Sequence, residues 1–183
     1  MSSEDVRRTI GSTAEEILER RAQSLALESA EEEVTDSLSM LLFRIGDEWY
    51  AIRVSDVREI FQEYDVTALP CTPAFILGVT NVRGEILSVT DPALLTGLGK
   101  IVGTDGAQPP AVVVTSGGVT TALVVDEIGD IVEVPNASVE PPVSMIDRAQ
   151  AAFVVGSVFI DGMMVGLLDA DRVLEPVGLA SHH

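Results

Sequence analysis

Hydrophobic and polar residues alternate along most of the chain after residue 40, which is the spacing of strands with one buried face. Pairs of such segments are joined by short turns that contain glycine, and glycine supplies the positive φ angle of tight hairpins. The four predicted hairpins are Leu41–Ile45 with Trp49–Ile52, Val79–Val82 with Ile86–Val89, Ala111–Thr115 with Thr120–Val125, and Phe153–Ile160 with Met163–Leu168. Short helices are expected at Ser55–Arg58, Pro92–Leu95 and Asp169–Leu174, and loops at Gly103–Pro110 and Pro135–Ala149. The pattern predicts a mainly β body.

A weak internal repeat runs through these hairpins. Shifted by 71 residues, the first hairpin falls on the third, with Gly46 on Gly117. Shifted by 78 residues, the second hairpin falls on the fourth, with Gly84 on Gly162. The units therefore follow the order A-B-A′-B′. This order predicts two similar small β-barrels that pack against one another, because each is too thin to bury its apolar faces alone.

The first 37 residues differ in composition from the rest of the chain. They hold ten acidic and four basic residues and no aromatic residue, whereas residues 38–183 hold all eight aromatic residues. Two overlapping capping boxes begin at Ser12 and Thr13, and apolar residues then recur at helical spacing. We predict an amphipathic helix over residues 13–27. Its apolar stripe either packs on the chain's own body, frays in solution, or docks on a partner.

Charge and residue usage exclude several classes of function. The chain has 29 acidic and 11 basic residues and a net charge of −18, so its surface repels nucleic-acid phosphates and anionic membranes. The only histidines are His182 and His183, so the body lacks a histidine base or ligand. There is no signal peptide and no stretch near the about 20 apolar residues of a membrane span. With a single cysteine, Cys71, these features predict a cytoplasmic protein with no membrane insertion and no nucleic-acid partner.

The remaining acids and nucleophiles form no recognisable catalytic pattern. Asp126 and Glu127 are adjacent, and neighbours in a strand point to opposite faces, so they cannot flank one substrate bond. Asp91 and Asp169 occupy equivalent repeat positions before predicted helices and are expected to be N-caps. Cys71 has no basic neighbour and is expected to be an inert buried thiol. With no metal-ligand or phosphate-loop spacing, we expect no enzyme, no cofactor and no metal.

One arginine stands out as a candidate for recognition. The segment Asn81-Val82-Arg83-Gly84 places it at a hairpin tip, in a body with seven basic and 19 acidic residues. Arginine can hold a carboxylate through two parallel hydrogen bonds. An ordinary surface arginine accounts equally well for the same pattern.

Five segments carry a recognisable set of motifs: Leu42–Ile52, Val57–Ile60, Thr72–Leu87, Leu123–Ile128 and Val155–Asp169. Together they resemble the CheW family of chemotaxis coupling proteins. The resemblance covers about residues 38–175 in the expected order, and its most specific part is the P-x-F-I-x-G-V-x-N-x-R-G stretch. The chain departs from the family at Ser88–Ala93, where the usual basic residue is missing.

The resemblance implies a fold of two interlocked, five-stranded, SH3-like barrels with short helices. The N-terminal helix predicted over residues 13–27 is additional to this fold. The resemblance also implies a non-enzymatic adaptor that binds the regulatory domain of a CheA-type histidine kinase and the cytoplasmic tip of chemoreceptors, in arrays at the inner membrane. Carried over by position, Glu59 and Arg83 match the family's paired acid and arginine. The receptor groove would then lie between the barrels, near Val57, Ile60, Asn81, Arg83 and Gly84.

These inferences divide the chain into an acidic tail over residues 1–37, a CheW-like domain over 38–175 and a C-terminal tail over 176–183 that resembles the remnant of a tag. Three alternatives stay open. A carboxylate-dependent enzyme on a β-barrel requires two acids that converge in one pocket. A small-ligand binding module requires a deep closed pocket. A CheW-like docking module for pilus motility or another non-flagellar output keeps the fold, and the long N-terminal tail hints at such a divergent system.

Overall fold

The computed structural model describes residues 17–24, 36–97, 101, 106–142 and 148–180. The chain divides into two units, residues 1–37 and 38–183, and each is described by itself. In the first unit, residues 17–24 form a helix. The remainder of the predicted helix over residues 13–27 lies outside the described residues, as do His182 and His183. No helix in the described part of the chain is long and apolar enough to cross a membrane.

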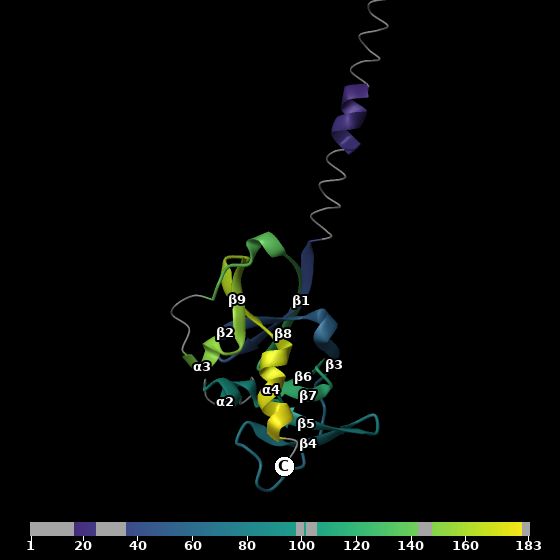
Figure 1. Ribbon diagram of the computed structural model, residues 1–183. Helices are drawn as coiled ribbons and strands as arrows, with labels where there is room; N and C mark the ends of the chain where they lie inside the picture. Colours follow the sequence, from purple (N-terminus) through teal and green to yellow (C-terminus); the bar gives the residue numbers. More distant parts are fainter. Residues whose placement is uncertain (1–16, 25–35, 98–100, 102–105, 143–147, 181–183) are drawn as a thin grey trace, which may run out of the picture. The chain divides into compact units, whose positions relative to one another are not determined.

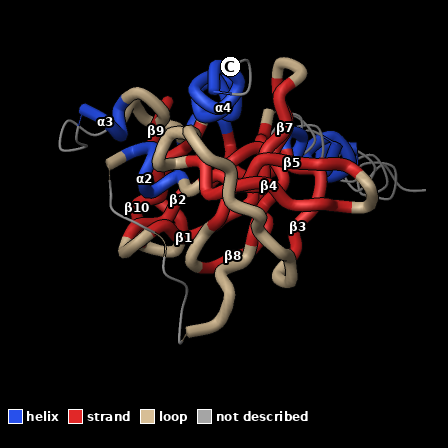
Figure 2. The backbone as a smooth tube through the Cα atoms, turned by 90° about the horizontal axis from the view of Figure 1, so that it is seen from below, coloured by secondary structure: helices blue, strands red, loops and turns tan. Residues whose placement is uncertain are grey.

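The second unit is built from two five-stranded sheets with short helices outside them (Figure 1, Figure 2). Sheet 1 has the order β8-β1-β2-β10-β9 and sheet 2 the order β3-β6-β7-β5-β4. The strands of sheet 1 are β1 (Ser37–Ile45), β2 (Glu48–Arg53), β8 (Glu127–Pro135), β9 (Val154–Ile160) and β10 (Met163–Leu168). Those of sheet 2 are β3 (Val57–Phe61), β4 (Ile76–Val82), β5 (Glu85–Thr90), β6 (Ala111–Ser116) and β7 (Val119–Val124). The four predicted hairpins and the mainly β, SH3-like class are confirmed.

Each sheet draws strands from both sequence repeats. Sheet 1 combines the β1–β2 hairpin of the first repeat with β8, β9 and β10 of the second. Sheet 2 combines the β6–β7 hairpin of the second repeat with β3, β4 and β5 of the first. In both sheets a parallel strand pair joins the two hairpins, with Val165 opposite Trp49 in sheet 1 and Ser88 opposite Thr121 in sheet 2. The sequence order A-B-A′-B′ thus folds as A with B′ and A′ with B. Neither half of the chain contains all five strands of either sheet, so the two barrels are interlocked.

Some predicted elements differ from the observed ones. The prediction of a helix at Ser55–Arg58 is wrong, because the 3-10 turn η1 (Val54–Asp56) is followed directly by strand β3. The register of β3 against β6 shifts between Val57 and Glu59, which marks a β-bulge that interrupts the alternation. The remaining helical elements are α2 (Pro92–Thr96), η2 (Asn136–Ser138), α3 (Arg148–Ala151) and α4 (Ala170–Ala180). Helix α4 extends beyond the predicted Asp169–Leu174. In the region expected to be a loop, η2 forms and α3 begins.

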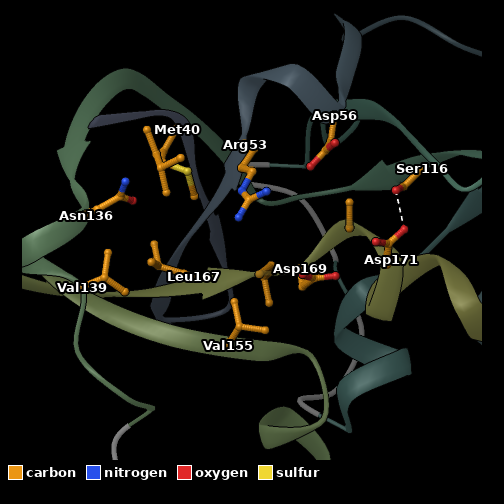
Figure 3. A pocket seen from close by; sticks show the side chains of 13 residues that line it. Met40, Arg53, Asp56, Ser116, Asn136, Val139, Val155, Leu167, Asp169 and Asp171 are labelled. Atoms are coloured by element: carbon orange, nitrogen blue, oxygen red, sulfur yellow. Dashed lines mark hydrogen bonds between the residues drawn. The ribbon is translucent and has the colours of Figure 1, made fainter. Parts of the chain in front are cut away.

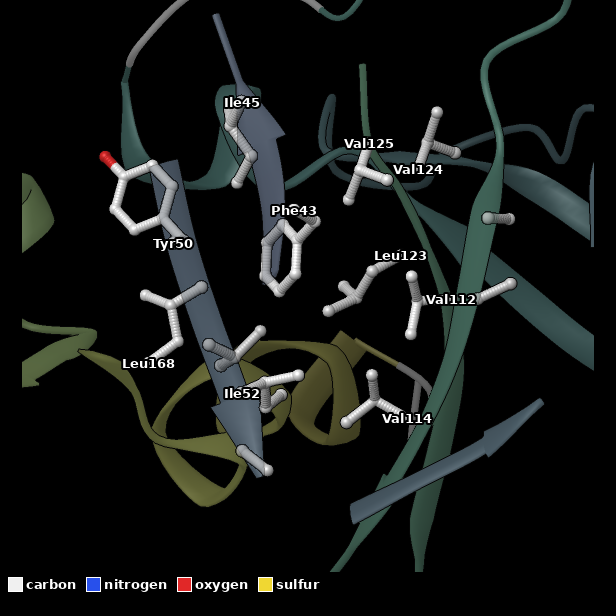
Figure 4. Packing of buried hydrophobic residues seen from close by; sticks show 14 of the residues in the cluster. Phe43, Ile45, Tyr50, Ile52, Val112, Val114, Leu123, Val124, Val125 and Leu168 are labelled. Atoms are coloured by element: carbon white, nitrogen blue, oxygen red, sulfur yellow. The ribbon is translucent and has the colours of Figure 1, made fainter. Parts of the chain in front are cut away.

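Two clusters of buried side chains hold the second unit together. The larger one joins the sheets, where Phe43 and Ile52 of sheet 1 meet Val112 and Leu123 of sheet 2 (Figure 4). The smaller one involves sheet 1 and contains Met40, Leu42, Ala51, Val134, Val158, Val165 and Leu167. Consecutive residues of β1 therefore face two different cores. Because burial of one large apolar side chain stabilises a fold by about 1.5–3 kcal/mol, the shared cluster makes the two barrels one cooperative body.

The two acids expected to cap helices do so. The side chain of Asp91 is fully buried and accepts hydrogen bonds from two backbone N–H groups at the start of α2. Its second carboxylate oxygen accepts a bond of 3.0 Å from the backbone N–H of Ile101. Asp169 accepts one bond of 3.2 Å from the backbone N–H of Arg172 in α4. Helix α4 follows β10 of sheet 1 but packs on β6 and β7 of sheet 2, so it also ties the sheets together (Figure 1).

The loops after β3 and after β8 fold back onto the outermost strands of the two sheets. Thr67 forms a bridge to β4, and Glu140 forms the equivalent bridge to β9. Both bridges lie beside glycines that the repeat relates by 78 residues. A Cβ atom on Gly78 would lie 2.3 Å from the carbonyl oxygen of Thr67, and one on Gly156 would lie 3.0 Å from that of Glu140. The missing side chains let these loops cover part of each sheet edge.

Candidate functional site

The turn between β4 and β5 presents Arg83 in a fixed position. Val82 pairs with Glu85, so Arg83 and Gly84 are the two central turn residues, with φ angles of 52° and 87°. Positive values at both positions are those of a type I′ turn, which matches the twist of the flanking strands. The backbone N–H of Gly84 donates a hydrogen bond of 2.8 Å to Oδ1 of Asn81. The asparagine thereby helps to hold an arginine in a conformation that such residues seldom adopt.

Two ion pairs connect this turn to strand β3, and we call them the hairpin clamp. Arg83 Nη2 lies 3.3 Å from Glu59 Oε2. Arg58 holds both carboxylate oxygens of Glu85, at 3.2 and 2.7 Å. These hydrogen bonds lower the pKa of the Glu85 carboxyl and raise that of the Arg58 guanidinium. The bulge in β3 explains how two consecutive residues both reach the hairpin.

The six residues predicted to bind partners come together on sheet 2. Three lie in β3, one lies near the end of β4 and two form the turn of the β4–β5 hairpin: Val57, Glu59, Ile60, Asn81, Arg83 and Gly84. The side chain of Arg83 is 85% exposed, whereas that of Glu59 is 23% exposed. The acid is therefore a partly buried support and the arginine is available to solvent. Binding of a partner by these six residues stays a prediction.

A cleft of about 400 Å³ opens where sheet 1 meets the end of β6 in sheet 2 (Figure 3). None of the six predicted residues lines it. Its lining residues are Leu38, Met40, Arg53, Asp56, Ser116, Asn136, Val139, Val155, Leu167, Leu168, Asp169, Ala170 and Asp171. Apolar side chains such as Met40 and Leu167 form one side, and the acids lie on the other (Figure 3). The cleft is thus lined by residues that the sequence analysis did not predict to bind a partner.

The acidic side of the cleft brings together three carboxylates from distant parts of the chain. Burial raises the pKa of Asp56, the guanidinium of Arg53 opposes that rise, and the negative charges of Asp169 and Asp171 add to it. The hydroxyl of Ser116 donates a hydrogen bond to Asp171 (Figure 3). Within the described part of the chain, no group of three His, Cys, Asp or Glu side chains is placed to hold a metal ion. The acidic and apolar sides of the cleft together suit a partner that carries a positively charged group beside an apolar group.

The β9–β10 hairpin exposes an apolar surface that the sequence also did not single out. Phe159 is 63% exposed, Met164 46% and Met163 42%. A hollow of about 460 Å³ lies beside the methionines and is lined by Trp49 and Tyr50 among others. The shift of 78 residues maps this hairpin onto the β4–β5 hairpin, but in the sequence its apolar residues look like those of a buried strand.

The prediction that the Cys71 thiol is buried is wrong. Cys71 is exposed and has a positive φ angle of 60°. Leu69, two residues before it, is also exposed. Cys71 lies in the loop between β3 and β4, which crosses the surface.

Comparisons with known proteins agree with this architecture. The family model described as CheW-like domain matches residues 39–177. A probable chemotaxis protein CheW from Rhizobium etli is 30% identical over 134 residues, which cover 73% of this chain and 85% of the relative. The protein FrzA from Myxococcus xanthus is 33% identical over 135 residues, with coverage of 73% and 82%. The crystal structure of the scaffolding protein TtCheW from Thermoanaerobacter tengcongensis has a TM-score of 0.67 and 29% identity, and covers 76% of this chain and 93% of that one. The chain belongs to the CheW-like domain family, as the sequence motifs indicated.

Proposed function

We propose that the chain is a chemotaxis coupling adaptor. It binds the regulatory domain of a CheA-type histidine kinase and the cytoplasmic tip of chemoreceptors, and it transmits the state of the receptor through contacts and not through a chemical reaction. Membership of the CheW-like family and the similarity to a scaffolding protein support this role. Bound to receptors, the protein would work in the cytoplasm, in arrays at the inner membrane.

The observation that carries the proposal is the exposed Arg83 above the partly buried Glu59. The 3.3 Å ion pair orients the guanidinium, and most of its surface stays available for a partner. An exposed pair contributes only about 0–1 kcal/mol to stability. A buried carboxylate on a partner gains far more from a fixed arginine, because charge-assisted bonds strengthen when water is excluded. The clamp therefore fits recognition better than it fits stabilisation.

The alternative of a carboxylate-dependent enzyme requires acids that converge, and three acids do line the cleft. Each already has a structural task or a charged neighbour. Asp169 caps α4, Asp171 accepts a bond from Ser116, and Asp56 is attracted by Arg53. These roles and the family support a non-catalytic adaptor.

The receptor has two candidate contacts, and substitutions distinguish them. The predicted contact is the surface around Arg83, and the cleft is the groove observed between the sheets. If the receptor binds at the hairpin, Arg83→Glu abolishes most of the affinity for a receptor-tip peptide and Asp171→Asn leaves it unchanged. The opposite result assigns the receptor to the cleft and removes the predicted site.

Titration calorimetry with two purified probes tests the function itself. The probes are a CheA-type regulatory domain and a receptor-tip fragment, each added to the full chain. The adaptor role predicts saturable binding of both. If the correctly folded chain binds neither probe, the proposed function is wrong.

A second possibility keeps the fold and makes the chain a CheW-like docking module with a non-flagellar output. The similarity to FrzA, which is not named as a chemotaxis protein, favours it. In that case the kinase contact is kept and the output is not flagellar. Deletion of the gene would then impair surface motility or another response while swimming towards attractants stays normal.

A further inference from the structure

We propose that Arg58 is a positioning residue for the contact around Arg83. Arg58 occupies the carboxylate of Glu85, which would otherwise compete for Arg83. The guanidinium of Arg83 thereby stays on Glu59 and keeps its exposed side open to a carboxylate of the partner. The inference rests on the proposed function and deepens it, because it names a residue that acts on the predicted receptor contact without touching the receptor.

The charged side chains of the hairpin clamp gather where the tip of the β4–β5 hairpin lies against β3. Arg58 and Glu59 are consecutive in β3, and only Gly84 separates Arg83 from Glu85 in the chain. The pairing is crosswise, since the arginine of each segment holds the acid of the other. Hydrogen bonds to Glu85 are the main cause that raises the pKa of the Arg58 guanidinium, and the negative charge of Glu59 adds to it. Both acids are therefore within the electrostatic reach of Arg58.

The two ion pairs of the clamp are unequal. Arg58 donates to both carboxylate oxygens of Glu85, at 3.2 and 2.7 Å, and such paired bonds are the stronger form. Arg83 approaches Glu59 only to 3.3 Å, and its side chain is 85% exposed. Without Arg58, the free carboxylate of Glu85 would compete with Glu59 for this loosely held guanidinium. It would also repel a carboxylate of the partner, because like charges at such short range oppose each other.

In the described strands, backbone pairing does not join the hairpin tip to β3. The order of sheet 2 is β3-β6-β7-β5-β4, so β3 and β4 are its two outermost strands. Side chains therefore set where the tip lies relative to β3. The pair with two hydrogen bonds, Arg58 with Glu85, is better suited to this task than the longer contact of Arg83.

The internal repeat replaces both members of this pair together. Arg58 corresponds to Gly129, and Glu85 corresponds to Met163. The turn of the β9–β10 hairpin also lacks an arginine, because Asp161 stands there. The hairpin without an arginine to position is thus the one without the positioning pair, which supports a joint role for these side chains in the other hairpin.

A double-mutant cycle with the receptor-tip fragment tests the inference in the full chain. Arg58→Ala leaves the clamp with an excess negative charge beside Arg83, so we expect it to weaken binding by about fivefold or more. Arg58→Ala combined with Glu85→Ala restores the charge balance and should restore the wild-type affinity. Glu85→Ala alone should bind at least as tightly as the wild type. Arg58→Lys keeps a positive charge at Glu85 and should retain most of the affinity.

Titration calorimetry measures these affinities, and an unchanged melting temperature confirms that each variant is folded. Arg172→Ala is the matched control, because it removes the same charge from an exposed position of α4 and should leave the affinity unchanged. The Nε–Hε resonance of Arg83 in NMR spectra reports the position of its guanidinium without a partner. We expect this resonance to shift in Arg58→Ala and to return to the wild-type position when Glu85→Ala is added.

The outcomes separate this inference from the proposed function. Equal losses of affinity in Arg58→Ala and Glu85→Ala would mean that the pair only stabilises the hairpin. A double variant as weak as Arg58→Ala would mean that Arg58 touches the partner itself. Wild-type affinity in Arg58→Ala would mean that Glu85 does not compete for Arg83. Each of these results overturns the inference and leaves the adaptor role standing, whereas a wild-type chain that binds neither probe removes both.

Discussion

The β4–β5 and β9–β10 hairpins have the same backbone and opposite surfaces. Arg83 and Asp161 both lie in the left-handed region, with φ angles of 52° and 49°, and the glycines that follow them have angles of 87° and 78°. The first hairpin is tied to β3 by two ion pairs and exposes one large apolar side chain near its turn, that of Ile86, whereas the second exposes three. The internal repeat therefore preserves the backbone of the turn and of its two strands. The chemistry at the tips is free to differ because these side chains do not support the core.

The proposed function requires two partners, and the two hairpins present unlike surfaces. A fixed arginine suits a carboxylate, and an exposed apolar surface suits apolar groups. Each surface lies in a different sheet, so changes in one need not disturb the other. Substitutions at equivalent positions of the two repeats can therefore show which features are shared and which are specific.

The largest effect is expected where the two repeats share the backbone most strictly. Gly78→Ala forces a Cβ to within 2.3 Å of a carbonyl oxygen at a φ of 150°, whereas the equivalent Gly156→Ala meets its neighbours at 2.9 and 3.0 Å. We expect Gly78→Ala to lower the free energy of unfolding by about 3 kcal/mol or more, and Gly156→Ala by clearly less. Urea unfolding measures both values. Equal losses would mean that the loop over β4 can move aside as easily as the loop over β9.

The two helix caps should also contribute unequally to stability, and the larger loss is again expected in the first repeat. Asp91 is buried and accepts three backbone hydrogen bonds, whereas Asp169 accepts one of 3.2 Å from Arg172. Asp91→Ala leaves buried donors without partners, so we expect a loss of about 2–3 kcal/mol, compared with about 1 kcal/mol for Asp169→Ala. Thermal unfolding of the two variants provides the test. A larger loss at Asp169 would show that the cap of α4 carries more of the contact between the sheets than the hydrogen bonds indicate.

Transfer of an arginine to the second turn asks whether the hairpin clamp depends only on side chains. Asp161→Arg recreates the charge of Arg83, with Asp130 in the position equivalent to Glu59. We expect a gain of about 0–1 kcal/mol that disappears at about 1 M salt, where exposed pairs are screened. Chemical unfolding at low and high salt measures it. A loss of stability at both salt concentrations would mean that β8 and its hairpin do not share the geometry of β3 and its hairpin.

The smallest effect concerns a pair of acids that the repeat also relates. Asp56 lies in the cleft and has a raised pKa, whereas its equivalent Glu127 is exposed and paired with Arg44 at 3.1 Å. A carboxyl with a raised pKa binds more protons in the folded state, so its charge costs stability at neutral pH and the cost is relieved as the pH falls. We expect Asp56→Asn to raise stability by on the order of 0.5 kcal/mol at pH 7 and to have no effect well below pH 3.8.

Glu127→Gln is the matched control for that substitution. It removes a surface ion pair, so stability should stay the same or fall slightly at pH 7. If Asp56→Asn destabilises the protein at pH 7, the attraction of Arg53 outweighs burial and the neighbouring acids.

The hairpins were predictable because alternation and turn glycines are local signals. Strand β3 was missed since the bulge at Arg58 breaks its alternation, and most residues of β8 are exposed or only partly buried. The exchange of strands between repeats depends on pairing between distant segments, and an internal repeat cannot say which copy pairs with which. The cleft likewise gathers Asp56, Asp169 and Asp171 from separate segments.

The candidate site residues divide in the same way, into those that the sequence indicated and those that only the folded chain reveals. The contact between Glu59 and Arg83 was predicted from family resemblance, and the distance of 3.3 Å agrees with it. The exposed apolar residues of the β9–β10 hairpin are Phe159, Met163 and Met164, and in the sequence they look like part of a buried strand. Only exposure in the folded chain distinguishes a binding surface from a core.

The central claim is that this chain is a bridge with separate faces for two partners. Analytical ultracentrifugation of the full chain mixed with both the CheA-type regulatory domain and the receptor-tip fragment tests it most directly. The account predicts a complex that contains all three components and loses the receptor fragment with Arg83→Glu while it keeps the kinase domain. Two binary complexes that exclude each other would contradict it, because the partners would then compete for one surface.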